Sequence, residues 1–197
     1  MKLTLPLLLT IGRVVAIPVV LVMFYVDVRI AGHEVSRQLA TVLYAAAAIT
    51  DWLDGYLARK WNQTSKFGAF LDPVADKLLV AVCLVMLLQD RPGGVLAVLT
   101  AVIIGREITI SALREWMAEL GSRAHVAVSW IGKVKTAFQM TAIGMMIWEI
   151  DTFRLPIYDI GYVLLFIASA LTIWSMIVYL RAAWPLMSES EAADPKK

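Results

Sequence analysis

The sequence predicts an all-α protein that crosses a membrane six times, with its helices arranged around a polar cavity open to the cytoplasm. Hydrophobic residues make up 60% of the 197 residues and the mean hydropathy is +0.73, which is typical of a membrane protein rather than a soluble globule. Six apolar segments follow one another along the chain, each near the ~20 residues that a spanning helix needs. The charges inside these segments all fall toward one side of the membrane.

The expected spans are bounded by polar or turn-forming residues. The first is too long, and too interrupted by Arg13, for a cleavable signal peptide. The third and fourth are separated by Asp90-Arg91-Pro92-Gly93-Gly94, a sequence that ends helices. The other breaks lie at 27–37, 59–66, 115–123 and 149–156. In order, the expected spans are 5–25, 38–58, 70–88, 95–113, 126–148 and 158–180.

No internal repeat of about 20–50 residues is visible. We therefore expect residues 1–197 to form one domain, with a flexible polar tail at 188–197. Cys83 is the single cysteine, so the chain cannot form an internal disulfide. His33 and His125 are isolated and lack the spacing of zinc ligands. The formal net charge is only +2, and no nucleic-acid partner is expected.

The basic residues predict the orientation in the membrane. With an even number of spans both termini share one side, and that side holds fourteen of the 18 Lys and Arg residues. The positive-inside rule therefore places both termini in the cytoplasm. Charged residues within spans normally face a bundle interior or a wet cavity, which predicts one polar cavity open to the cytoplasm. The four basic residues on the opposite side are Arg29, Arg37, Arg91 and Arg154.

Four aspartates form the most informative pattern in the chain. Asp51 and Asp54 are three residues apart and Asp72 and Asp76 are four apart, so each pair occupies one face of a helix. A carboxylate near the bilayer centre costs ~2.5–3.5 kcal/mol, so four of them need compensating partners. Carboxylate oxygens suit hard cations such as Mg²⁺ or Mn²⁺. The pattern predicts a two-metal site for phosphoryl transfer within the membrane.

The same segment resembles the CDP-alcohol phosphotransferase family. It reads Asp51-x2-Asp54-Gly55-x2-Ala58-Arg59-x8-Gly68-x3-Asp72-x3-Asp76 and matches the family signature at every fixed position, eight residues within a window of 26. The segments from Gly105-Arg106-Glu107-Ile108 to Gly121, and from Ser129 to Thr136, resemble the branch of the family that uses glycerol 3-phosphate as the acceptor. Near the N-terminus the chain has Thr4-Leu5-Pro6-Leu7 where family members often have Asn-x-Pro-Asn, but it retains Thr10-Ile11-Gly12-Arg13.

The resemblance implies a reaction and roles for the aspartates. CDP-diacylglycerol and glycerol 3-phosphate would give phosphatidylglycerophosphate and CMP, through attack of the acceptor hydroxyl on the β-phosphorus. Asp51 and Asp72 would bridge two divalent ions, Asp54 would complete one site, and Asp76 would contact the other. Asp76 would also act as the general base that accepts the proton of the hydroxyl.

The resemblance also implies contacts with CDP-diacylglycerol. Small residues at Gly55 and Ala58 let a nucleotide diphosphate approach the helix backbone, although close helix packing would explain them too. The guanidinium of Arg59 suits a diphosphate, and it would serve equally as a topology anchor. The complete set of expected contacts is Thr10, Asp51, Asp54, Gly55, Ala58, Arg59 and Ser65.

The acceptor site is expected among basic residues outside the signature. A dianionic acceptor needs several cations in a low-dielectric pocket, and the candidates are Arg106, Arg114, Lys133 and Lys135. Lys133 and Lys135 diverge on a helix, so both cannot point at one phosphate; Lys135 with Arg106 is the preferred pair. Glu107, Glu115 and Glu119 offer the alternative that these cations only form salt bridges.

Two other functions stay open at this point. A related enzyme would use another acceptor, such as inositol phosphate or phosphatidylglycerol. A divalent-cation transporter would use the aspartates as its pathway, although a conduit should have polar groups in both halves of the membrane. The resemblance further implies a bacterial inner-membrane location, membrane lipids as surroundings, and a homodimer, the state often found in the family.

Overall fold

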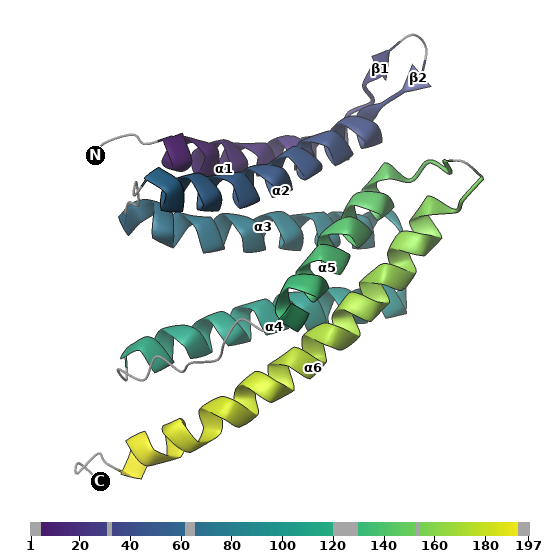
Figure 1. The fold of residues 1–197 in the computed structure, drawn as a ribbon. Coiled ribbons are helices and arrows are strands. Elements are labelled where there is room, and N and C mark those ends of the chain that lie inside the picture. The colour runs from purple at the N-terminus through teal and green to yellow at the C-terminus, as the bar shows by residue number, and fades with distance from the viewer. Residues whose placement is uncertain (1–4, 31–32, 62–65, 120–129, 153, 193–197) are drawn as a thin grey trace.

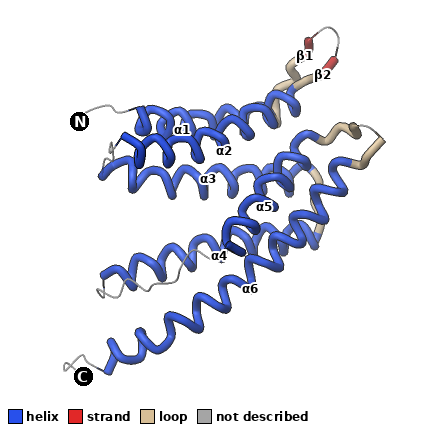
Figure 2. The backbone as a smooth tube through the Cα atoms, viewed as in Figure 1, coloured by secondary structure: helices blue, strands red, loops and turns tan. Residues whose placement is uncertain are grey.

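The computed structural model describes the chain except for residues 1–4, 31–32, 62–65, 120–129, 153 and 193–197. In the described part, helices account for most of the chain and two very short strands form a hairpin (Figure 1, Figure 2). In chain order the elements are α1 Leu5–Met23, β1 Arg29–Ile30, β2 His33–Glu34, α2 Ser36–Trp61, α3 Lys66–Asp90, α4 Gly94–Glu119, α5 Trp130–Trp148 and α6 Ile157–Ala192.

The all-α class predicted from the sequence is confirmed for the described residues. Each of the six expected segments overlaps one helix. The break expected at 27–37 contains the antiparallel hairpin, in which Arg29 pairs with Glu34. Helix α6 is longer than the expected span 158–180, because it continues to Ala192 and so includes the first five residues of the expected tail. The remainder of that tail lies outside the described residues.

The helices form two groups that meet at one end. Helix α1 packs against α2 and α3, whereas α6 packs against α4 and α5, and contacts from α2 to α5 and from α3 to α4 join the groups. The two groups meet near the hairpin and diverge toward the ends that carry the chain termini (Figure 1). Buried apolar residues of all six helices form the shared core, among them Val20, Tyr44, Leu84, Ile103, Ile143 and Leu165.

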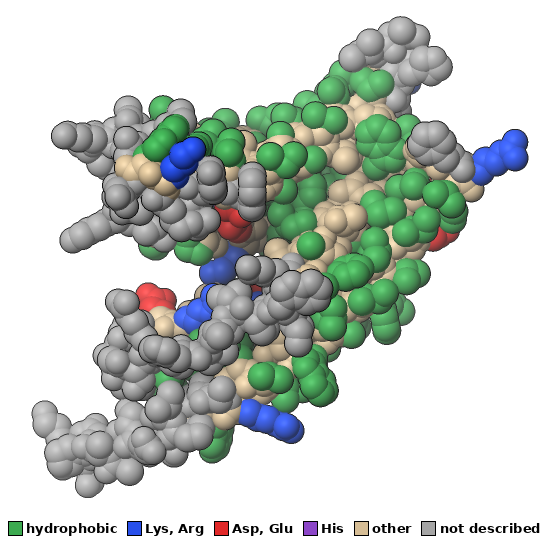
Figure 3. All heavy atoms as spheres, viewed as in Figure 1, with side chains coloured by type: hydrophobic (Ala, Val, Ile, Leu, Met, Phe, Trp, Pro, Cys, Tyr) green, Lys and Arg blue, Asp and Glu red, His purple; other side chains and the backbone are tan. Residues whose placement is uncertain are grey.

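Large apolar side chains cover much of the outer surface. Ile108 and Trp174 are each 63% exposed, and Figure 3 shows apolar side chains over most of the face in view. Among the described helices, the segments Gly94–Met117 and Ile157–Arg181 are long and apolar enough to cross a membrane, by length and composition. An apolar exterior of this extent marks a surface that contacts lipid or another protein.

A network of charges closes the end of the molecule near the hairpin. Arg37 at the start of α2 contacts Asp90 at the end of α3 and Glu149 just after α5, with 3.7 Å between its Nε and Oε2 of Glu149. Arg91 contacts the same glutamate. Glu149 has a φ of 61°, a left-handed conformation common directly after a helix. The network therefore joins the start of α2, the end of α3 and the end of α5.

Candidate active site

Helix α1 brings a polar pair to the aspartates of the signature. Its buried stripe follows the helical repeat and runs through Leu7, Thr10, Arg13, Ile17 and Val20. The last two are apolar and join the core, whereas Thr10 and Arg13 lie one turn apart and are only 1% and 2% exposed. Thr10 and Arg13 therefore face the other helices rather than the solvent.

Arg13 links the two helices that carry the aspartates. Its Nη1 donates to Oδ1 of Asp51 on α2 over 2.8 Å and also to Oδ1 of Asp76 on α3. The side chain of Arg13 has no exposed surface, whereas those of Asp51 and Asp76 are each 41% exposed. The guanidinium thus contacts the carboxylates from inside the bundle, and part of each carboxylate stays accessible from outside.

Thr10 contacts a third aspartate. Its Oγ1 donates to Oδ1 of Asp72 over 2.6 Å. Three of the four aspartates that the sequence predicted as one site are therefore tied to one face of α1. Thr10 was predicted to contact CDP-diacylglycerol, and the structure places it beside the acidic residues where that headgroup is expected.

Other predicted residues of the signature are described only by their backbone. Asp54, Gly55, Ala58 and Arg59 lie on α2, within the eight residues that follow Asp51. Asp54 therefore comes one turn after Asp51 on the same helix face. Ser65 lies outside the described residues.

A basic cluster lies on the other helix group. Arg106 on α4 donates through Nη1 to Oε1 of its neighbour Glu107 over 2.7 Å, and Nζ of Lys135 on α5 lies 3.7 Å from the same oxygen. Lys135 is 5% exposed and its Nζ has no hydrogen-bond partner. One carboxylate therefore contacts two largely buried cations, Arg106 and Lys135, the pair preferred from the sequence for the acceptor.

Helix α6 adds a residue that the sequence did not single out. Ser175 accepts a hydrogen bond over 3.4 Å from Nη2 of Arg106. The exposed guanidinium of Arg114 lies over the ring of Tyr179, with its Cζ 5.7 Å from the ring centroid. Lys133 lies in the first turn of α5, and its side chain is outside the described part.

Figure 3 shows a hollow that opens at the left edge of the view, between the two helix groups. Acidic and basic side chains gather around this hollow, in contrast to the apolar surface elsewhere on the same face. The acidic cluster, which is Asp51, Asp72 and Asp76 with their partners Thr10 and Arg13, lies on α1–α3. The basic cluster, which is Arg106 and Lys135 with Glu107 and Ser175, lies on α4–α6. Carboxylates therefore lie on one helix group and cations on the other, with the hollow between the two groups.

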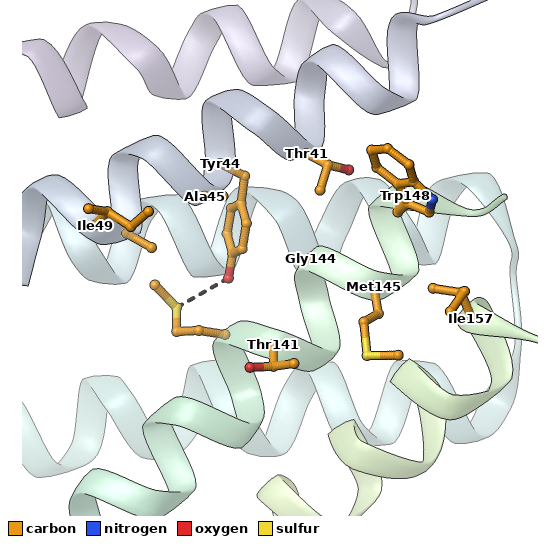
Figure 4. A pocket seen from close by; sticks show the side chains of 11 residues that line it. Thr41, Tyr44, Ala45, Ile49, Thr141, Gly144, Met145, Trp148 and Ile157 are labelled. Carbon is orange, nitrogen blue, oxygen red and sulfur yellow. Dashed lines mark hydrogen bonds between the residues drawn. The ribbon is translucent and has the colours of Figure 1, made fainter. Parts of the chain in front are cut away.

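An apolar pocket of about 410 Å³ lies between α2 and α5 (Figure 4). Tyr44 points across it and its hydroxyl lies 3.1 Å from Sδ of Met140. The lining residues Thr41, Tyr44 and Ala48 lie at helical spacing on one face of α2, and Asp51 continues that face. The pocket and the acidic cluster therefore share one face of the same helix.

The acidic residues have the donor chemistry that a hard divalent cation needs. Carboxylate oxygens from α2 and α3 already converge on one positive group, the guanidinium of Arg13. Among the side chains that the structure describes, no three acidic, histidine or cysteine residues gather around one point. The side chain of Asp54, the fourth predicted ligand, is outside that set.

The fold and the two clusters define a helical protein with a largely apolar exterior and with acidic and basic clusters on separate helix groups. The chain belongs to the CDP-alcohol phosphatidyltransferase family, whose model matches residues 3–174. It is 49% identical to the CDP-diacylglycerol–glycerol-3-phosphate 3-phosphatidyltransferase of Haemophilus influenzae over 183 residues, which cover 93% of this chain and 95% of that protein. Proteins of the same name from Escherichia coli K12 and Shigella flexneri serotype 5b are 48% identical over 93% of this chain and 96% of theirs.

Proposed function

We propose that this protein transfers a phosphatidyl group from CDP-diacylglycerol to glycerol 3-phosphate, with release of CMP. The observation that carries the proposal is the near-full-length similarity to proteins named for this reaction. The buried basic cluster supports the choice of acceptor, because a phosphorylated acceptor needs cations in a low-dielectric pocket and a neutral alcohol does not.

In this mechanism the basic cluster binds the phosphate of the acceptor. Arg106 offers a planar donor set, and Lys135 offers an Nζ whose donors have no hydrogen-bond partner. The acceptor hydroxyl then attacks the β-phosphorus. A new P–O bond forms, the bond from the β-phosphorus to the bridging oxygen breaks, and CMP leaves with that oxygen. Asp76 accepts the hydroxyl proton through a carboxylate that is partly exposed.

The acidic residues are proposed to hold two Mg²⁺ or Mn²⁺ ions. Asp51, Asp54, Asp72 and Asp76 would supply the oxygen ligands, the first two from α2 and the last two from α3. Bound divalent ions would neutralise the charge on the diphosphate and on the leaving CMP.

The nucleotide lipid is proposed to lie along α2. Thr10, Gly55, Ala58, Arg59 and Ser65 are its expected headgroup contacts. The apolar pocket on the same face of α2 as Asp51 gives room for part of one acyl chain. A lipid whose diphosphate meets the aspartates would then extend its chain toward Tyr44.

The proposed location is the bacterial inner membrane, with six spans and with both termini and the site on the cytoplasmic side. The excess of basic residues on one side supports this orientation, and the apolar exterior and the two apolar helices support a membrane location. Labelling of single-cysteine variants in intact cells checks it. Arg154→Cys should react with an impermeant maleimide added outside, and Lys60→Cys should react only after the cells are opened.

Release of CMP tests the proposed reaction. The purified protein in detergent should release CMP from CDP-diacylglycerol only when glycerol 3-phosphate and either Mg²⁺ or Mn²⁺ are present, and EDTA should abolish release. If CMP is released with inositol phosphate or phosphatidylglycerol but not with glycerol 3-phosphate, the proposed acceptor is wrong. Release that persists in EDTA would overturn the metal site, and divalent-ion flux in vesicles without CMP release would favour the transporter.

A further inference from the structure

Arg13 is a buried cation at the position where two acidic helices meet. Its guanidinium contacts Oδ1 of Asp51 and Oδ1 of Asp76, which are 38 and 63 residues away in the sequence. The side chain has no exposed surface. It therefore does not line the surface that a substrate or a hydrated ion reaches first.

The contact of Arg13 with the two carboxylates offsets two electrostatic costs. Two carboxylates from different helices repel one another in a low-dielectric environment unless a positive group lies between them. A buried guanidinium is equally costly unless it is paired. The contacts of Arg13 with Asp51 and Asp76 meet both requirements: the guanidinium is paired, and the two carboxylates share a positive group.

We propose that Arg13 is an internal counter-ion that stands in for a divalent cation between α2 and α3. It stabilises the metal-free protein, and its positive charge weakens the binding of metal to the same carboxylates. The inference rests on the metal site of the proposed function and adds a role for a residue outside the predicted site. Arg13 is thus a positioning residue that makes the fold independent of metal at the expense of metal affinity.

Arg13→Gln tests this proposal because it removes the charge and keeps a hydrogen-bonding side chain. The purified variant in detergent should bind Mn²⁺ at least about tenfold more tightly than the unchanged protein, since a unit positive charge beside the ligands has been removed. Electron paramagnetic resonance of free Mn²⁺ measures this affinity without substrate. In EDTA, the variant should unfold at a lower temperature than the unchanged protein. Saturating Mn²⁺ should raise the unfolding temperature of the variant by more than it raises that of the unchanged protein.

Arg37→Gln is the matched control. Arg37 also pairs with two carboxylates, Asp90 and Glu149, but at the other end of the bundle. This variant should unfold at a lower temperature with or without Mn²⁺, and its Mn²⁺ affinity should be unchanged. Arg13→Lys keeps the charge, so its Mn²⁺ affinity should stay near that of the unchanged protein even if its packing is poorer.

The outcomes separate this inference from the metal site itself. If the unchanged protein binds no Mn²⁺, the proposed metal site fails and the inference fails with it. If the unchanged protein binds Mn²⁺ and Arg13→Gln binds it equally or less tightly, the metal site stands and the counter-ion role is overturned. Should Arg13→Gln not fold, Arg13→Lys decides: a large gain in Mn²⁺ affinity despite the retained charge would overturn the role.

Discussion

The acidic and basic clusters are built on the same plan with opposite charges. On α1–α3, one arginine joins Asp51 and Asp76; on α4–α6, one glutamate joins Arg106 and Lys135. The two differ in how far the joining residue is buried. Arg13 has no exposed side-chain surface, whereas that of Glu107 is 28% exposed.

Under the proposed function, we infer from this difference that the two helix groups have different roles. The acidic cluster is fixed from inside by contacts across three helices, which suits groups that must hold a fixed geometry during the reaction. The basic cluster is held by a carboxylate that solvent can reach, so an incoming phosphate can replace it. Damage to the acidic cluster should therefore lower kcat, and damage to the basic cluster should raise the KM for the acceptor.

The largest effect is expected for Asp76→Asn. The substitution keeps the shape of the side chain but removes the proposed base, so kcat should fall about 10²–10⁴-fold, while Mn²⁺ binding survives in part through Asp51, Asp54 and Asp72. CMP release measures kcat. Asp90→Asn on the same helix, where the carboxylate pairs with Arg37, should leave kcat near normal. Near-normal turnover of Asp76→Asn would rule out the base assignment.

Lys135→Ala should act on the acceptor instead. Loss of a charged donor to a phosphate corresponds to about a tenfold to hundredfold rise in the KM for glycerol 3-phosphate, with a smaller change in the KM for CDP-diacylglycerol. Steady-state CMP release with each substrate varied gives both values. Arg114→Ala provides the comparison, because its exposed guanidinium lies over Tyr179 and a smaller rise is expected. Equal effects on both substrates would remove Lys135 from the acceptor pocket.

The sequence predicted the helices and the members of the acidic cluster because both depend on local spacing. Apolar runs of membrane-spanning length produced the six helices, and intervals of three and four residues grouped the aspartates. It did not predict that Arg13 meets Asp51 and Asp76, since those contacts depend on how α1 packs against two distant helices. The available signal was a charge within an apolar span, one turn after Thr10.

The contact of Ser175 was also not predicted from the sequence. Its hydroxyl meets Arg106 across the interface of α4 and α6, but a serine in an apolar helix looks the same whether it packs or binds. The hairpin at 29–34 and the extension of α6 to Ala192 were likewise missed. Both lie at element boundaries, where local propensity competes with packing.

An intermediate effect is expected for Glu107→Gln. Without the carboxylate, the two buried cations Arg106 and Lys135 repel each other, so thermal unfolding should begin a few degrees lower, at ~2–4 °C for each kcal/mol lost. Glycerol 3-phosphate should restore more stability to this variant than it adds to the unchanged protein. Equal stabilisation of both proteins would show that the acceptor phosphate does not take the place of Glu107.

The smallest effect is expected in the apolar pocket. Ala48→Phe places a ring in the space between α2 and α5, and overfilling costs ~1–3 kcal/mol, so the KM for CDP-diacylglycerol should rise roughly fivefold while that for glycerol 3-phosphate stays the same. Val42→Phe is the control, since Val42 is 59% exposed on α2 and does not line the pocket. If both variants behave alike, the acyl chain lies elsewhere, and the face shared by Tyr44 and Asp51 reflects only the packing of α2 against α5.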